Sequence, residues 1–234
     1  MKFGYLIVAS LLVASAPTHA AEPVAQSPEM DMRCYLAART AGALPIDPRA
    51  AVITDMLGRF YLGRMSGQLS DTEIKALAST QNAALKAKDF PDLIEPCATF
   101  LYERDANVAD DTLQGLDKDA SDAKPETKPA PRTPELDMRC HMFARHLITT
   151  ATDPLSKLAA AEWLSFYLGR ASSQLSDAEL ATVSGSEAKT AGIWGTPGLI
   201  EQCKDYADRR SVEVAELINQ GKKQDAASAT GSEE

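Results

Sequence analysis

Apolar residues recur at helical spacing through most of the chain, and no stretch shows the alternation of a half-buried strand. The sequence therefore predicts an all-α protein. Ser27 and Pro28 predict a helix start, with Ser27 as N-cap and proline in the first helical position. The stripe that follows has the i, i+3, i+4, i+7 spacing of one helical face and consists of Cys34, Ala37, Ala38 and Ala41. We expect this first helix to run from Pro28 to about Ala41.

Three further helices are predicted before residue 105. Asp47-Pro48 opens the second by the same cap-then-proline rule, and this helix ends near Ser66-Gly67. A capping box, Ser70-Asp71-Thr72-Glu73, opens the third, which runs to about Lys88. Pro91 marks the start of the fourth, which carries Cys97, and Pro96 predicts either an irregular first turn or a regular helix that begins only there.

The whole pattern returns 106 residues later without a gap, so the chain is a tandem duplication. Asp31-Met32-Arg33-Cys34 returns as Asp137-Met138-Arg139-Cys140, and Phe60-Tyr61-Leu62-Gly63-Arg64 returns as Phe166-Tyr167-Leu168-Gly169-Arg170. The equivalent of the small alanine stripe is larger in the second copy, with Phe143 and Leu147, which predicts that each copy packs its own core. In the second copy we expect helix three to break early at Ser184-Gly185-Ser186 and helix four to stop at Gly221.

These elements give two tandem four-helix units with loose segments around them. The predicted layout is a signal peptide over 1–20, a first helical repeat over 28–104, a disordered linker over 105–135, a second repeat over 136–220 and a disordered tail over 221–234. The linker is acidic, rich in Ala, Pro, Thr and Lys, and almost free of large apolar residues, so it cannot bury enough surface to order itself.

The first twenty residues have the marks of a secretory signal peptide. Lys2 is followed by an apolar run from Phe3 to Ala16 and by small residues before a cut after Ala20. The run is too short to span a bilayer. We therefore expect a periplasmic or secreted protein that keeps no membrane span after cleavage.

The net charge of the chain argues against some classes of binding partner. The chain has 24 Lys and Arg residues against 33 Asp and Glu, and removal of Lys2 with the signal peptide leaves a net charge near −10. Such an acidic chain is a poor match for nucleic acid or an anionic membrane surface. Other proteins are the expected partners, and the sequence does not predict the oligomeric state.

Export decides how the four cysteines are interpreted. In an oxidising compartment an even number of cysteines indicates disulfides, here with three connectivities. Because 63 positions separate the cysteines in each copy, the duplication favours Cys34–Cys97 and Cys140–Cys203. No Cys-x-x-Cys and no histidine at ligand spacing is present, so we expect no metal and no cofactor.

Each copy also places a glycine inside a predicted helix, where glycine costs about 1 kcal/mol relative to alanine. Gly63 and Gly169 therefore predict the close approach of another helix, and a ligand groove over the glycine is the alternative. Arg64 and Arg170 follow directly. We interpret them as contacts to the helix C-terminus or as stacking on Tyr61 and Tyr167, with anion binding as the alternative.

No constellation that catalysis requires stands out, and we do not expect an enzyme. Helix capping explains the Ser and Glu residues that recur in both copies, Ser70 with Glu73 and Ser176 with Glu179. After removal of the signal peptide only His141 and His146 remain, and a surface position is expected for both.

The segments around the second cysteine of each copy carry a family resemblance. Pro91-Asp92-Leu93-Ile94-Glu95-Pro96-Cys97 and Pro197-Gly198-Leu199-Ile200-Glu201-Gln202-Cys203 resemble the closing motif of the HdeA-type periplasmic acid-stress chaperones, and Met32-Arg33-Cys34-Tyr35-Leu36 is similar to their first cysteine segment. Members of that family are small exported helical proteins with one disulfide between an early and a late helix. Here the cysteines lie farther apart and the unit is doubled.

The resemblance implies a chaperone that acid activates. Protonated carboxylates and rising positive charge would loosen the packing, the bridges would limit the opening, and exposed apolar stripes would bind unfolding proteins. The candidate partner-binding residues lie in and beside the repeated Phe-Tyr-Leu-Gly-Arg segment and are Phe60, Tyr61, Arg64, Trp163, Phe166, Tyr167 and Arg170. The alternative is a bivalent protein-binding module of the bacterial envelope without chaperone activity, in which two tethered domains gain avidity.

Overall fold

The computed structural model describes residues 26–43, 48–86, 89–108, 132–189 and 197–230. The described residues form eight α-helices and no strand, as the periodicity predicts. The helices are α1 (Pro28–Gly42), α2 (Pro48–Gln68), α3 (Asp71–Ala84), α4 (Phe90–Asn107), α5 (Pro134–Thr150), α6 (Pro154–Gln174), α7 (Asp177–Lys189) and α8 (Pro197–Thr230). We call residues 26–108 the first half and residues 132–230 the second half. The predicted signal peptide lies outside the described residues, as do positions 109–131 of the predicted linker.

Local capping chemistry sets several helix starts at the predicted residues. The Ser27 hydroxyl accepts a hydrogen bond from the backbone N–H of Met30 at 3.3 Å, ahead of Pro28. The capping box at Ser70 and Glu73 is complete in both directions. The second copy repeats this box with Ser176 and Glu179. The structural role that we predicted for these four side chains is confirmed.

Two predicted helix ends in the second half are wrong. Helix α7 continues through Ser184-Gly185-Ser186 to Lys189. Helix α8 passes through Gly221 and continues to Thr230. A Cβ at Gly221 would collide with the backbone carbonyl of Lys75 on α3, so this glycine allows α8 to pack closely on α3. Packing against another helix outweighs the local preference of glycine for a helix end.

The predicted cysteine pairing is confirmed. Cys34–Cys97 joins α1 to α4, and Cys140–Cys203 joins α5 to α8. In each half the hydroxyl of a buried tyrosine donates a hydrogen bond to the carbonyl of the second cysteine, from Tyr61 to Cys97 at 2.9 Å and from Tyr167 to Cys203. Two disulfides fit an oxidising compartment.

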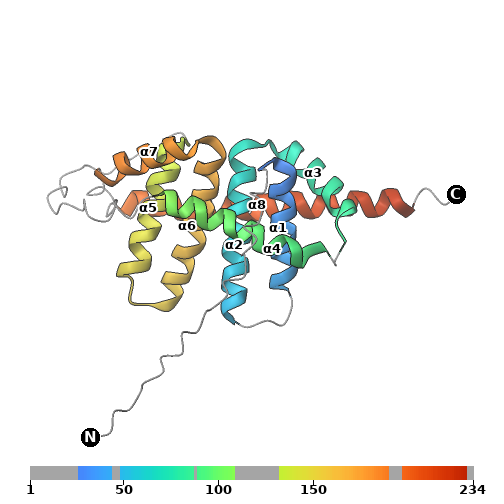
Figure 1. The fold of residues 1–234 in the computed structure, drawn as a ribbon, viewed down its shortest axis with the longest axis horizontal. Coiled ribbons are helices and arrows are strands. Elements are labelled where there is room, and N and C mark those ends of the chain that lie inside the picture. The colour runs from blue at the N-terminus through green and yellow to red at the C-terminus, as the bar shows by residue number, and fades with distance from the viewer. Residues whose placement is uncertain (1–25, 44–47, 87–88, 109–131, 190–196, 231–234) are drawn as a thin grey trace, which may run out of the picture.

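The two halves pack directly against each other. The hairpins of α1 with α2 and of α5 with α6 stand side by side, and α8 runs across both halves (Figure 1). The most extensive contact between helices is that of α2 with α6, and the C-terminal part of α8 lies on α3 of the first half. Buried apolar residues of both halves belong to one continuous cluster. The expectation that each copy packs its own core is therefore wrong, because the helix faces with the repeated pattern bury one another.

Candidate functional site

The contact between α2 and α6, which we call the junction, brings the repeated Phe-Tyr-Leu-Gly-Arg segments together. A Cβ at Gly63 would collide with the carbonyl oxygen of Phe166, and a Cβ at Gly169 would collide with that of Phe60. The predicted close approach at these glycines is thus confirmed. The helix that approaches each glycine is its own duplicate.

The contact is reciprocal throughout. Gly67 and Ser173 are equivalent positions in the two copies, and a Cβ at Gly67 would touch the Ser173 hydroxyl. A position that faces its own equivalent lies on a two-fold axis. The junction is therefore arranged like the isologous interface of a symmetric dimer, although both sides belong to one chain.

A buried ion pair on each side of the axis reaches across the junction. Arg64 Nε donates to Asp31 Oδ1 at 2.8 Å within the first half, and Arg64 Nη1 donates to the carbonyl oxygen of Ser172 at 3.1 Å in the second half. Gln68 Nε2 donates to the other oxygen of Asp31 at 2.8 Å. One guanidinium thus joins α1, α2 and α6.

The same arrangement exists in reverse. Arg170 Nε donates to Asp137 Oδ2 at 2.9 Å, and Arg170 Nη1 donates to the carbonyl oxygen of Ser66 at 2.9 Å. Asp31 and Asp137 are both fully buried. Burial raises the pKa of each aspartate above its ordinary value, against the opposing effects of its arginine charge and hydrogen bonds. Desolvation therefore outweighs the attraction of the partner for these two carboxyls.

Ion pairs at the edge of the contact follow the same symmetry. Arg104 on α4 pairs with Asp177 on α7, and the equivalent Arg210 on α8 pairs with Asp71 on α3 at 2.7 Å. The last helix of each half thereby contacts the third helix of the other half. Both pairs are partly exposed, so they guide the register of the contact more than they stabilise it.

The structure buries nearly all the candidate partner-binding residues. Phe60, Tyr61 and Phe166 are at most 1% exposed, and Tyr167 is equally buried. Trp163 is partly exposed, and its Nε1 donates to Asp208 at 3.2 Å. Six of the seven residues therefore belong to the core, and they offer no free surface to a partner in this arrangement of the helices.

The predicted stacking of the two arginines on Tyr61 and Tyr167 is wrong. Arg64 lies over the ring of Phe100 at 5.1 Å, and Arg170 lies over the ring of Tyr206 at 5.1 Å. These rings come from α4 and α8, so the stacking joins helix two to helix four in each half. The alternative of a ligand anion at these arginines has no support, because Asp31 and Asp137 occupy them.

His141 does not lie at the surface, contrary to our expectation. It is fully buried, and the Leu164 carbonyl accepts a hydrogen bond from its Nδ1 at 2.9 Å. Its Nε2 lies 3.9 Å from Asp105 Oδ1 on α4 of the other half. Burial lowers the pKa of His141, against the opposing charge of Asp105, so the ring is neutral at pH 7. The other predicted surface histidine, His146, is half-buried.

Sequence reasoning missed Asp31 and Asp137 as partners of the arginines. A signal was present: in each copy the aspartate stands three residues before the cysteine, on the apolar stripe of the first helix. A charged residue on a buried face, repeated in both copies, indicates a buried partner of opposite charge. Ser66 and Ser172 offered no such signal, because they are bound through their carbonyl groups as well as through their side chains.

No protein-family model matches the chain, and neither does any curated protein or any solved structure. Within the described part of the chain, no helix is long and apolar enough to cross a membrane. The described residues also contain no group of three or more His, Cys, Asp or Glu side chains that could hold a metal ion.

Proposed function

We propose that this protein is an exported acid-stress chaperone and that the junction is its covered client-binding surface. One observation carries the proposal: the largest aromatic side chains of both copies are buried and belong to α2 and α6, the two helices that form the junction. Each disulfide joins two helices of the same half, so no disulfide among the described residues holds the two halves together. The halves can separate while each stays internally bridged.

His141 supplies a group that responds to acid at this contact. Its folded pKa lies below the ordinary value, so the native state binds this proton less readily than the unfolded chain does. The stabilising contribution of the neutral ring is complete above the ordinary pKa of about 6.5 and is lost as the pH falls toward the folded value. Asp105 of the other half attracts the charged ring, so the cost of protonation comes from burying the charge, and separation of the halves would relieve that cost by admitting water to the ring.

Carboxylates at helix starts add to the same response at lower pH. Hydrogen bonds with Ser70 lower the pKa of Glu73, and hydrogen bonds with Ser176 lower that of Glu179. Lowered carboxyl pKa values give stability that is present above the ordinary pKa and is lost as the pH falls through the folded one. Both capping boxes therefore weaken in strong acid.

Asp31 and Asp137 act in the opposite sense. Their folded pKa values are raised, so the native state takes up these protons more readily than the unfolded chain. Acid thus favours the packing of each half around its aspartate, whereas it weakens the contact at His141 and the capping boxes. The capping boxes lie at the starts of α3 and α7, so their loss acts within each half, whereas the charge buried at His141 acts where α4 of the first half meets the second half.

The alternative, a bivalent envelope module, needs two surfaces that are free at the same time. The repeated faces of α2 and α6 cover each other. A specific partner would therefore have to compete with the second copy of its own binding face, and this observation favours the chaperone.

A cross-linked variant tests the proposal. Gly67→Cys with Ser173→Cys places two thiols where the equivalent positions touch, within the reach of a disulfide. We expect the wild-type protein to bind a dye for apolar surface and to suppress aggregation of an acid-unfolded client as the pH falls from 7 to 2. The cross-linked variant should do neither, and the single variant Ser173→Cys should behave as wild type.

Two results would contradict the proposal. Equal client protection by the cross-linked and wild-type proteins would show that the junction is not the binding surface. The bivalent module would be favoured if the protein protected no client at any pH and one half formed a stable complex with an envelope protein at neutral pH.

A further inference from the structure

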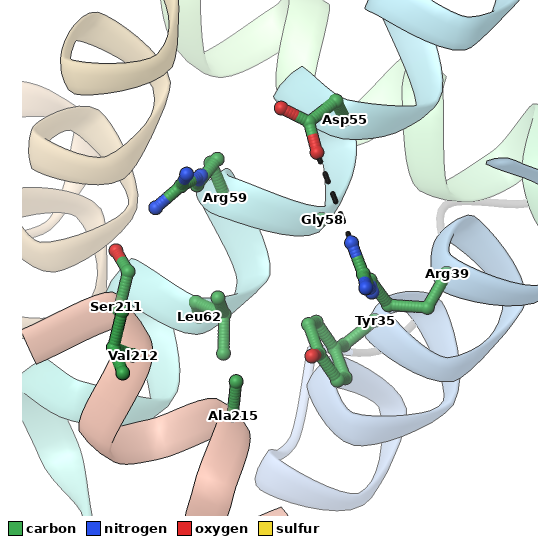
Figure 2. A pocket seen from close by; sticks show the side chains of 9 residues that line it. All are labelled: Tyr35, Arg39, Asp55, Gly58, Arg59, Leu62, Ser211, Val212 and Ala215. Carbon is green, nitrogen blue, oxygen red and sulfur yellow. Dashed lines mark ion pairs between the residues drawn. The ribbon is translucent and has the colours of Figure 1, made fainter. Parts of the chain in front are cut away.

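A small pocket lies where α1 and α2 of the first half meet α8 of the second half. Its volume is about 150 Å³, and its polar lining comes from Tyr35, Arg39, Asp55, Arg59 and Ser211. Figure 2 shows these side chains around the opening, with Arg39 on α1 directed toward Asp55 on α2. The pocket thus combines two guanidinium groups from neighbouring helices with a hydroxyl from a third.

The duplication provides a matched site in which the corresponding space is filled. The residue equivalent to Arg39 is Arg145, which lies 3.3 Å from the carboxylate of Asp105 on α4. Arg145 also donates to the carbonyl oxygen of Val108 at 2.8 Å. Asp105 on α4, the last helix of the first half, thus places a carboxylate beside Arg145 on α5, the first helix of the second half.

The first half lacks this built-in carboxylate. Ser211 stands at the position equivalent to Asp105, and Gly58 stands where the second half has the buried Leu164. The two replacements remove an acidic group and a leucine side chain from the same place. The carboxylate that remains for Arg39 is that of Asp55, at 4.0 Å and partly exposed to solvent.

The side chain of Ser211 itself indicates a missing partner. It is 3% exposed, and its hydroxyl has no hydrogen-bond partner among the described residues. A buried hydroxyl without a partner is costly, and a bound group that accepts its hydrogen bond removes that cost.

Two further cations, Arg59 and Lys222, lie near Arg39. Arg59 is already paired with Glu162 on α6 at 2.8 Å. Burial, together with the nearby charge of Arg39, lowers the pKa of Lys222 on α8. Asp55 is thus the one pocket carboxylate that faces these cations.

We propose that this pocket binds a small carboxylate ligand whose carboxylate group takes the place that Asp105 holds in the second half. Arg39 forms the ion pair with it, and the Ser211 hydroxyl donates a hydrogen bond. A pocket of about 150 Å³ admits a small molecule of a few heavy atoms. Acetate, propionate and glycine are of that size, and the carboxylate is the feature that they share.

Titration of the full-length protein at pH 7 tests this proposal. Acetate and propionate, each compared with chloride at equal ionic strength, should shift the amide resonances around Arg39 and Ser211 in a saturable way. Inorganic phosphate is titrated separately, because a preference for phosphate would overturn the assignment of a carboxylate ligand.

Arg39→Ala should weaken binding by roughly tenfold or more, the loss expected for one charged partner. Arg145→Ala is the matched control and should leave binding unchanged.

Two further variants give the pocket the residue that the matched site has at the equivalent position. Ser211→Asp should bring a carboxylate to Arg39, raise the melting temperature and abolish acetate binding. Gly58→Leu should fill the space and abolish binding without adding a charge, so it keeps the test valid if the aspartate variant folds poorly. Two results would overturn the proposal. One is the absence of saturable shifts when acetate and propionate are added to the wild-type protein. The other is that Arg39→Ala and Gly58→Leu show the same shifts as the wild-type protein.

Discussion

The two halves agree where they touch each other along the two-fold axis and differ where that contact ends. Near the axis, Gly63 and Gly169 make the same approach in both directions, and so do the arginines beside them. Away from it, the buried His141 and the partly exposed pair of Asp105 and Arg145 correspond to a pocket in the other half. Repetition in this chain therefore marks the surfaces that the copies offer each other. Divergence marks the places where one copy is free to do something else.

The largest effect is expected at the buried ion pairs. Arg64→Met leaves Asp31 as a buried carboxylate without its cation, which costs about 3–5 kcal/mol at pH 7. Because the pKa of Asp31 is already raised, the aspartate of the variant protonates readily, and the cost should shrink as the pH falls toward 5. Chemical unfolding at both pH values measures this change.

Arg170→Met sharpens the comparison between the halves. Asp137 has a second cation, Arg132, whose Nη1 lies 3.9 Å from Asp137 Oδ1, and Asp31 has no equivalent because Gln26 stands at that position. We therefore expect Arg170→Met to cost less than Arg64→Met. Equal costs would show that Arg132 contributes nothing to the stability of the second half.

A smaller effect is expected at the glycine contacts. Gly63→Ala and Gly169→Ala each force a methyl group into a backbone carbonyl of the opposite helix, which costs about 1–3 kcal/mol. Because the contact is reciprocal, the two costs should be similar. Gly185→Ala is the control: nothing lies within 4 Å of its added methyl group, so it should stabilise α7 by up to about 1 kcal/mol. Destabilisation by Gly185→Ala similar to that by Gly63→Ala would contradict the packing explanation.

Much of the local structure could be predicted from the sequence because its causes are local. Ser70 and Glu73 satisfy the first backbone groups of α3 through contacts three residues apart, so the capping box is visible in the sequence. The cysteine pairing followed from equal spacing in the two copies. The glycine inside each second helix correctly indicated that another helix lies close.

The arrangement of the halves could not be predicted, because periodicity shows that a face is buried without showing what buries it. Helix α2 packs against α1 of its own half and against α6 of the other half, and the spacing of its stripe does not tell the two apart. Gly221 illustrates the same limit, since the residue that predicted the end of α8 allows its close contact with Lys75. The buried His141 lies 3.9 Å from Asp105 on α4 of the other half, a contact between residues 36 positions apart that no local pattern records.

The smallest expected effect at neutral pH concerns that histidine. His141→Asn keeps a donor for the Leu164 carbonyl, which accepts from Nδ1 at 2.9 Å, but removes the titrating group. The wild-type protein should lose stability as the pH falls below about 6.5, with a slope of up to about 1.4 kcal/mol per pH unit from this one residue. The variant should lack that part of the slope, whatever constant cost the substitution adds at pH 7. Unfolding free energies measured from pH 7.5 to 5 give both slopes, and His146→Asn serves as the control. Parallel slopes for wild type and His141→Asn would remove His141 from the acid response, and the opening of the junction would then depend on carboxylates alone.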